Sequence, residues 1–180
     1  MYIERHFQMM AKYNDRMNNQ ILSVVESLNP IDLTENKGAY FKSIIGTLNH
    51  ILVGDIIWLS RFNLHSESYV SLKCVTTLPK PKSLSDILYP DLKSYKCVRK
   101  KVDSALVNWL DKDINVSDFH RNLEYSNTAG IKSSRNFGEL VSHLFNHQTH
   151  HRGQVSTLLY QMGHDIGATD FLYEIPEMSA

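Results

Sequence analysis

The segment 137–163 constrains this chain more than any other, because histidines share its helical pattern with apolar residues. At about 100° per residue, one stripe about 80° wide on such a helix collects Leu140, Leu144, His147, His151, Val155, Leu158 and Met162. A histidine that faces a core must find partners for its ring nitrogens. The i, i+4 spacing of His147 and His151 also lets one metal ion reach both rings. The segment therefore predicts an amphipathic helix with a candidate metal site on it.

The length and composition predict one soluble domain over residues 1–180. A chain of 180 residues buries roughly 70% of its unfolded surface without disulfides or a structural metal, so we expect any bound metal to be functional. The 19 basic residues balance 19 acidic ones, which favours neither a nucleic-acid nor a membrane partner. The N-terminus has no signal-peptide pattern, and we expect a cytoplasmic protein. Cys74 and Cys97 predict reduced thiols, with a single disulfide as the alternative.

The period of the apolar residues predicts four long helices. It lies near 3.6 over 4–28, 41–62, about 92–109 and 137–163. The second of these helices is apolar almost all round its axis, which is typical of a buried helix. Residues 63–82 carry polar side chains and two prolines. They indicate a long, partly extended connection that crosses the molecule, as in bundles whose neighbouring helices run parallel.

The third helix has two alternative starts. Ser83 and Asp86 resemble an N-terminal capping pair, but Pro90 follows them. That proline either kinks the helix or precedes its main body. The helix also carries the basic cluster Lys93, Lys96, Arg99, Lys100 and Lys101. We expect this cluster mostly on the outer, solvated face, with attraction of an anionic substrate as the alternative.

Between residues 114 and 136 the period changes from near 3.6 to 2. Apolar and polar residues alternate here, the apolar ones being Phe119, Leu123 and Tyr125, and a turn follows at Asn127-Thr128-Ala129-Gly130. This predicts a small β-hairpin. The expected fold is therefore all-α, a four-helix bundle with a long crossover connection and a small β-hairpin insertion between helices 3 and 4. Gly163 is placed to cap the last helix, and a short turn is expected from Thr169-Asp170.

His50, on the second predicted helix, is the expected partner of His147 and His151. Gly46 and Gly54 lie at neighbouring angles on its helix. Because glycine costs a helix up to about 1 kcal/mol relative to alanine, the two indicate either close helix packing or space left for a ligand. Three neutral imidazoles would hold a divalent ion and leave at least one position for water or substrate, which is typical of a reactive site.

The remaining candidates have weaker geometry. His143 lies one turn before His147 and could be a fourth ligand, a hydrogen-bond partner of a ligand or a surface residue; we favour the second role. His150 projects about 60° from His147 and is expected at the periphery. Asp55 points elsewhere around its helix and is not expected to reach the same metal.

Two alternatives to a metal site follow from the same residues. The three histidines could hydrogen-bond to one another, to backbone or to water, although this requires several well-placed partners. A serine or cysteine triad is the other, but the chain has no GxSxG elbow and no histidine tied to either cysteine by sequence context. A GxGxxG motif and a P-loop are absent too, so nothing favours nucleotide binding.

Three segments resemble the DinB family, which is also grouped with YfiT-like metal-dependent enzymes. They are MAKYNDRMNNQIL, FKSIIGTLNHILVGDIIWLSRF and HLFNHQTHHRGQVSTLLYQMGHDIGATDF, in the family's order, and the NHxxxHRGQ portion at 146–154 is the most specific. The resemblance implies a four-helix bundle with a long crossover, often dimeric. It also implies a metal bound by one histidine of helix two and two of helix four, here His50, His147 and His151. Arg16 stands where we expect an aromatic residue in many relatives.

The function expected from these observations is that of a metal-dependent enzyme acting on a small molecule. The metal would be Zn²⁺ or Ni²⁺, and the resemblance implies a transferase that uses a low-molecular-weight thiol, or a hydrolase. The alternative from a different functional class is a non-enzymatic, stress-related metal-binding or interaction module. The partners expected are a small-molecule substrate and a second copy of the chain.

Overall fold

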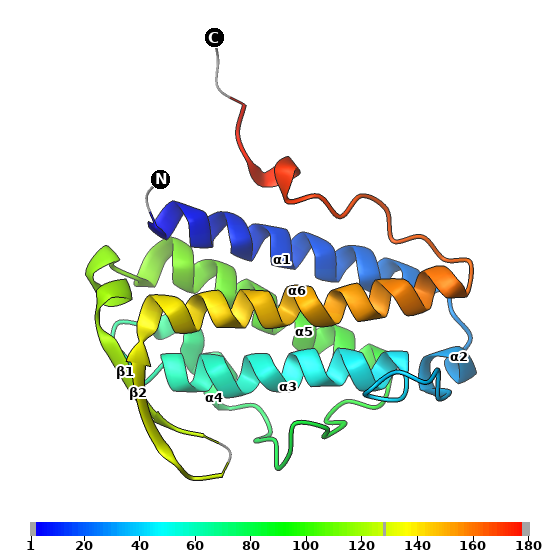
Figure 1. Cartoon of the computed structure of the whole chain (residues 1–180), viewed down its shortest axis with the longest axis horizontal. Coiled ribbons are helices and arrows are strands. Elements are labelled where there is room, and N and C mark those ends of the chain that lie inside the picture. The colour runs from blue at the N-terminus through cyan, green and yellow to red at the C-terminus, as the bar shows by residue number, and fades with distance from the viewer. Residues whose placement is uncertain (1–2, 128, 178–180) are drawn as a thin grey trace.

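The computed structural model describes residues 3–127 and 129–177, and this part of the chain is mostly helical. Its long helices are α1 (Ile3–Val25), α3 (Ile44–Phe62), α5 (Leu92–Asn108) and α6 (Phe137–Gln161). The short helical elements that connect or follow them are α2 (Pro30–Thr34), η1 (Val70–Leu72), α4 (Lys73–Thr76), η2 (Trp109–Asp113), η3 (Val116–His120) and η4 (Phe171–Glu174). An antiparallel hairpin of β1 (Asn122–Ser126) and β2 (Lys132–Asn136) completes the fold (Figure 1).

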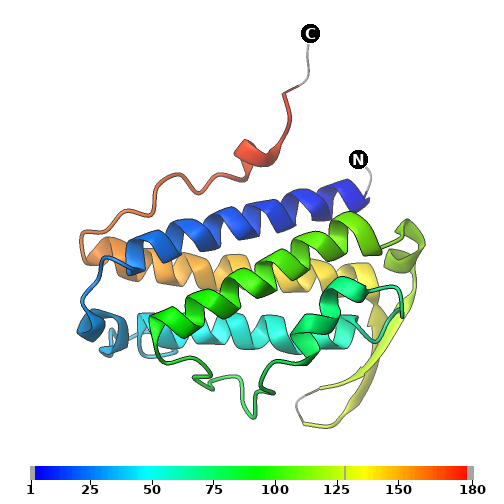
Figure 2. The same ribbon diagram turned by 180° about the vertical axis from the view of Figure 1, so that it is seen from behind.

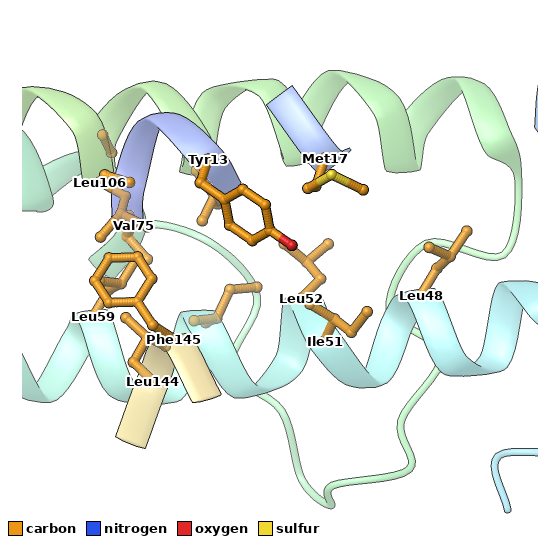
Figure 3. Close-up of a cluster of buried hydrophobic side chains, with 14 of the residues drawn as sticks. Tyr13, Met17, Leu48, Ile51, Leu52, Leu59, Val75, Leu106, Leu144 and Phe145 are labelled. Carbon is orange, nitrogen blue, oxygen red and sulfur yellow. The ribbon is translucent and has the colours of Figure 1, made fainter. Parts of the chain in front are cut away.

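The long helices lie side by side in both views of the molecule (Figures 1 and 2). Helix α3 packs against α6 and α5, and α1 packs against α5 and α6. Their inner faces and the short helix α4 form one apolar core. Figure 3 shows part of it, with Tyr13, Met17, Leu48, Ile51, Leu52, Leu59, Val75 of α4, Leu106, Leu144 and Phe145. Full burial of each such aliphatic side chain contributes about 1.5–3 kcal/mol, so this core holds the helices in place.

Polar side chains cap the N-termini of α3 and α6. Ser43 accepts a hydrogen bond from Gly46 N–H at 3.1 Å, so α3 starts at Ile44 and not at Phe41 as the apolar pattern predicts. Asn136 caps α6 in the same way, through Glu139 N–H. Gly163 follows α6 with a positive φ of 83°, which confirms its predicted place at the end of that helix.

The third long helix begins after Pro90. Asp91 is its N-cap and accepts from Ser94 N–H at 2.8 Å. Ser83 and Asp86 form a separate turn, in which the Ser83 hydroxyl donates to the Asp86 carboxylate at 2.6 Å. Of the two alternatives for the proline, the structure therefore has the one in which it precedes the main body of the helix.

The connection between α3 and α5 contains more helix than its sequence predicts. Elements η1 and α4 lie within it, and Tyr69, Leu72 and Val75 are fully buried there. The prediction of a partly extended segment missed them because a single helical turn has too few residues to show a period.

The hairpin lies between α5 and α6, as predicted, with Asn122 opposite Asn136 and Ser126 opposite Lys132. Leu123 is its buried residue. Phe119, which we expected in the first strand, lies instead in η3, because Asn115 and Asp118 form a capping box that starts a helical turn. Thr128, part of the predicted turn, lies outside the described residues.

The prediction of an outer basic face on α5 is wrong for Arg99. Its side chain is 1% exposed and pairs with Asp55 at 2.5 Å and Asp103 at 2.7 Å. The ion pairs with two buried carboxylates therefore compensate for burial of the guanidinium in the core. Lys93, Lys100 and Lys101 are exposed, as predicted.

Arg16 of α1 holds the segment that follows α6. It pairs with Glu174 at 2.8 Å and donates to the carbonyls of Ala168 and Asp170 at 3.1 Å and 2.9 Å. Its guanidinium also lies 5.6 Å from the Tyr173 ring. Arg16, where the resemblance led us to expect an aromatic residue, thus fastens this segment along α1 (Figure 1). Among the described helices, none is long and apolar enough to cross a membrane.

Candidate metal centre

The packing of α3 against α6 brings His50, His147 and His151 together. Each histidine offers one ring nitrogen, and the three nitrogens all lie within 4.8 Å of one another. His50 is buried, whereas the two histidines of α6 are half-buried. The i, i+4 spacing of the pair on α6 and its partner on α3 therefore form one cluster, with the residues that the sequence predicts.

Hydrogen bonds on the far side of two rings fix which nitrogen carries the proton. His50 Nδ1 lies 2.7 Å from the Leu84 carbonyl oxygen. His151 Nδ1 lies 2.9 Å from Oε1 of Gln154, whose amide nitrogen contacts His150. Because both partners are acceptors, each Nδ1 must be the donor. In the neutral rings the Nε2 atoms of His50 and His151 therefore present lone pairs.

These lone pairs face each other. The Nε2 atoms of His50 and His151 are 3.1 Å apart, and His147 Nε2 lies 2.9 Å from His50 Nε2. Two lone pairs at this distance repel unless a cation lies between them. His147 Nδ1 is in addition buried without a hydrogen-bond partner in the described part of the chain. Even when His147 donates its Nε2 hydrogen to His50, the lone pairs of His151 Nε2 and of the buried His147 Nδ1 lack a donor among the described residues. The donor set therefore fits a divalent transition-metal ion.

The three rings are held in the form that binds metal. Burial lowers the pKa of His50 against the opposing effects of the Leu84 hydrogen bond and of Asp55. Burial and then the neighbouring histidines lower the pKa of His147 to about 3. Burial also lowers the pKa of His151. All three imidazoles are therefore neutral at pH 7, so that a metal need not displace protons from them.

The two glycines beside His50 have different roles. A Cβ atom on Gly54 would lie 2.7 Å from Cε1 of His147, so only glycine lets that ring come so close to α3. A Cβ on Gly46 would collide with the Phe41 carbonyl oxygen, which is a packing constraint. The Phe41 ring in turn stacks on His50, with ring centroids 3.7 Å apart. Gly54 thus makes room for the site, whereas Gly46 serves packing.

The other candidates lie around the cluster. His143 contacts the Trp58 ring edge-on at 5.2 Å, and no hydrogen bond joins it to the three histidines within the described residues. The role that we favoured for it is filled by Gln154 and by the Leu84 carbonyl. The period of apolar residues could not have predicted the contact of Leu84 with His50, because Leu84 makes it through its backbone carbonyl and not through its side chain. His150 is exposed, as expected.

A network of buried polar side chains lies beside the cluster. Asp55 pairs with Arg99 and accepts from Gln148 Nε2 at 2.8 Å, so it points away from the histidines, as predicted. Asp103 accepts from Asn14 and Asn18 of α1, and Arg152 of α6 donates to Asn14. The network therefore joins all the long helices.

A cavity of about 590 Å³ opens beside the three histidines. Its lining comes mainly from α3, α6 and the hairpin, and includes Tyr40, Phe41, Ile57, Trp58, Arg61, Leu84, Tyr125, Asn127, His143, His150 and Gln154. A small molecule in this cavity would thus meet the cluster directly, between mostly apolar and aromatic walls.

Comparison with known proteins identifies the family of this chain. The model of the DinB family matches residues 2–178. Protein DinB of Bacillus subtilis (strain 168) is 22% identical over 167 residues, which cover 90% of this chain and 89% of that protein. No solved structure matches the chain. Since the family model covers nearly the whole sequence, the chain belongs to the DinB family.

Proposed function

We propose that this protein is a metal-dependent enzyme acting on a small molecule, as a thiol-dependent transferase or a hydrolase. The observation that carries the proposal is the pair of lone pairs on His50 and His151, which face each other beside a cavity. Three protein ligands leave a position free for substrate, which is typical of catalytic and not of structural metal sites. Zn²⁺ and Ni²⁺ both suit imidazole ligands.

Each residue of the site has a distinct task in this proposal. His50, His147 and His151 hold the ion, while Leu84 and Gln154 fix two of the rings through their Nδ1 hydrogens. When bound there, a divalent ion supplies Lewis acidity that lowers the pKa of a water molecule or thiol beside it towards neutrality. The aromatic walls of the cavity orient the substrate and limit access of bulk water.

The rest of the molecule is proposed to serve this site. The long helices form a four-helix bundle, with residues 63–91 as its long crossover. Two copies of the chain form a dimer, and the protein works in the cytoplasm, where its two free cysteines would stay reduced.

Chelation separates this proposal from a non-enzymatic metal-binding module. The experiment screens the metal-loaded protein against thiol, ester and amide substrates, with and without a chelator, and follows the fold by circular dichroism. The enzyme proposal expects turnover that chelation abolishes while the helical signal persists. If no substrate turns over and chelation unfolds the protein, the metal is structural and the module is the better description.

A further inference from the structure

Arg61 lies in the last turn of α3, at the end of the cavity remote from His50. Its guanidinium lies 4.7 Å from the Trp58 ring centre and 5.0 Å from that of Tyr125. One of its nitrogens donates to the Ser126 carbonyl at 2.9 Å. The helix and the hairpin therefore hold this cation from several sides, with its position fixed in the cavity wall.

The charge of Arg61 has no counter-charge in the described part of the chain. None of the salt bridges in that part of the chain involves Arg61. A guanidinium has five N–H groups, and the one hydrogen bond to Ser126 leaves the others for a ligand. No acidic side chain lines the cavity among the described residues. Burial lowers the pKa of Arg61, so an anion beside it would restore the stabilisation of its charge that burial removes.

We infer that Arg61 binds an anionic group of the substrate, a carboxylate or a similar planar oxyanion, while the reactive group of the same molecule lies at the histidines. This inference rests on the proposed function and adds the substrate class. The planar fork of a guanidinium matches a carboxylate through two parallel hydrogen bonds. The substrate is thus an anionic molecule with an apolar body.

The geometry also sets the length of that body. His147 lies against Gly54, and Arg61 follows Gly54 by seven residues on the same helix. At 1.5 Å per residue, the backbone of Arg61 lies about 10 Å beyond that of Gly54 along the helix axis. Trp58 and Ile57 line the cavity between them. An extended chain of about eight carbons, or an aromatic ring with a short arm, spans this distance.

A purely structural role is the competing explanation, since Arg61 also joins α3 to the hairpin. That role requires the ring contacts and the Ser126 hydrogen bond, but it gives no preference for a charged ligand. The preference between a carboxylate and its neutral amide therefore distinguishes the two explanations.

The test uses two probes that differ only at one end. Octanedioic acid monohydroxamate carries a metal-binding hydroxamate and a carboxylate, and its partner carries a primary amide in place of the carboxylate. Both are titrated by calorimetry into the metal-loaded full chain and into the variants Arg61→Gln and Arg61→Lys. Arg135→Gln, which changes an exposed arginine of β2, is the matched control. Circular dichroism checks that each variant is folded.

The inference expects the wild type and Arg135→Gln to bind the carboxylate probe about 10- to 100-fold more tightly than the amide probe. Arg61→Gln should lose this preference and bind the amide probe as the wild type does, and Arg61→Lys should keep part of it. Equal affinities of the wild type for the two probes, or an undiminished preference in Arg61→Gln, would overturn the inference.

The metal content of the same samples tests the proposed function independently of the role of Arg61. If the protein takes up no metal, 4-phenylbutyrate and 4-phenylbutyramide are titrated into the metal-free chain and followed by tryptophan fluorescence. The same preference for the carboxylate, and its loss in Arg61→Gln, is expected there. Its absence overturns the inference in that case too.

Discussion

At the scale of single residues, the site depends on the groups that pack against each imidazole ring or accept its hydrogen bond. Gly54 is the sharpest case, since a Cβ atom would press on the His147 ring. We expect Gly54→Ala to weaken metal binding about tenfold or more, because overpacking costs about 1–3 kcal/mol and 1.4 kcal/mol is a factor of ten. Metal affinity measured by competition with a chromophoric chelator checks this. Gly153→Ala is the control, because its Cβ would contact nothing within 4 Å; equal effects of the two changes would contradict the role of Gly54.

The partner of His151 gives a second prediction at the same scale. Gln154 accepts the Nδ1 hydrogen of that ring at 2.9 Å and so keeps Nε2 directed at the cluster. Removal of such a partner lowers metal affinity about 10- to 100-fold, and we expect Gln154→Ala to fall in this range. The same competition assay measures it, with the exposed Gln161 at the end of α6 changed to alanine as control. An unchanged affinity in Gln154→Ala would show that this hydrogen bond does not orient His151.

At the scale of the elements, the buried polar network fixes how the long helices meet. Arg99 pairs with both Asp55 and Asp103, so Arg99→Met would leave two buried carboxylates without their ion-pair partner. We expect a loss of about 3–5 kcal/mol in the free energy of unfolding, measured with urea. Lys100→Met, on the exposed side of the same helix, should change it by about 0.5 kcal/mol or less. A loss below about 1 kcal/mol in Arg99→Met would mean that the network adds little to stability.

The helices and the hairpin could largely be predicted from the sequence, because the period of apolar residues records which face of an element is buried. Arg99 shows the limit of this reasoning. Its side chain is buried through pairing with charges from another helix, which hydropathy patterns cannot reveal. The sequence did not predict the short helices η1 and α4, because they have too few residues to show a period of apolar positions.

At the scale of the whole molecule, the candidate site depends on contacts between distant parts of the chain. The sequence could predict His147 and His151 from their spacing, and His50 from its buried helix and neighbouring glycines. It could not predict the Leu84 carbonyl, which a long connection brings to His50, or the place of Arg61 between Trp58 and Tyr125. Such groups are defined by tertiary packing and leave no local pattern.

The most direct test of the three-histidine centre is the metal content of the protein purified without a histidine tag and reconstituted with Zn²⁺ or Ni²⁺. Mass spectrometry of the metals should find one ion per chain in the wild type and in His120→Ala, whose histidine is exposed and remote from the cluster in sequence. His147→Ala should lose most of that metal, because two imidazoles hold an ion far less firmly than three. Absence of stoichiometric metal from the wild type, or full retention by His147→Ala, would contradict the centre described for His50, His147 and His151.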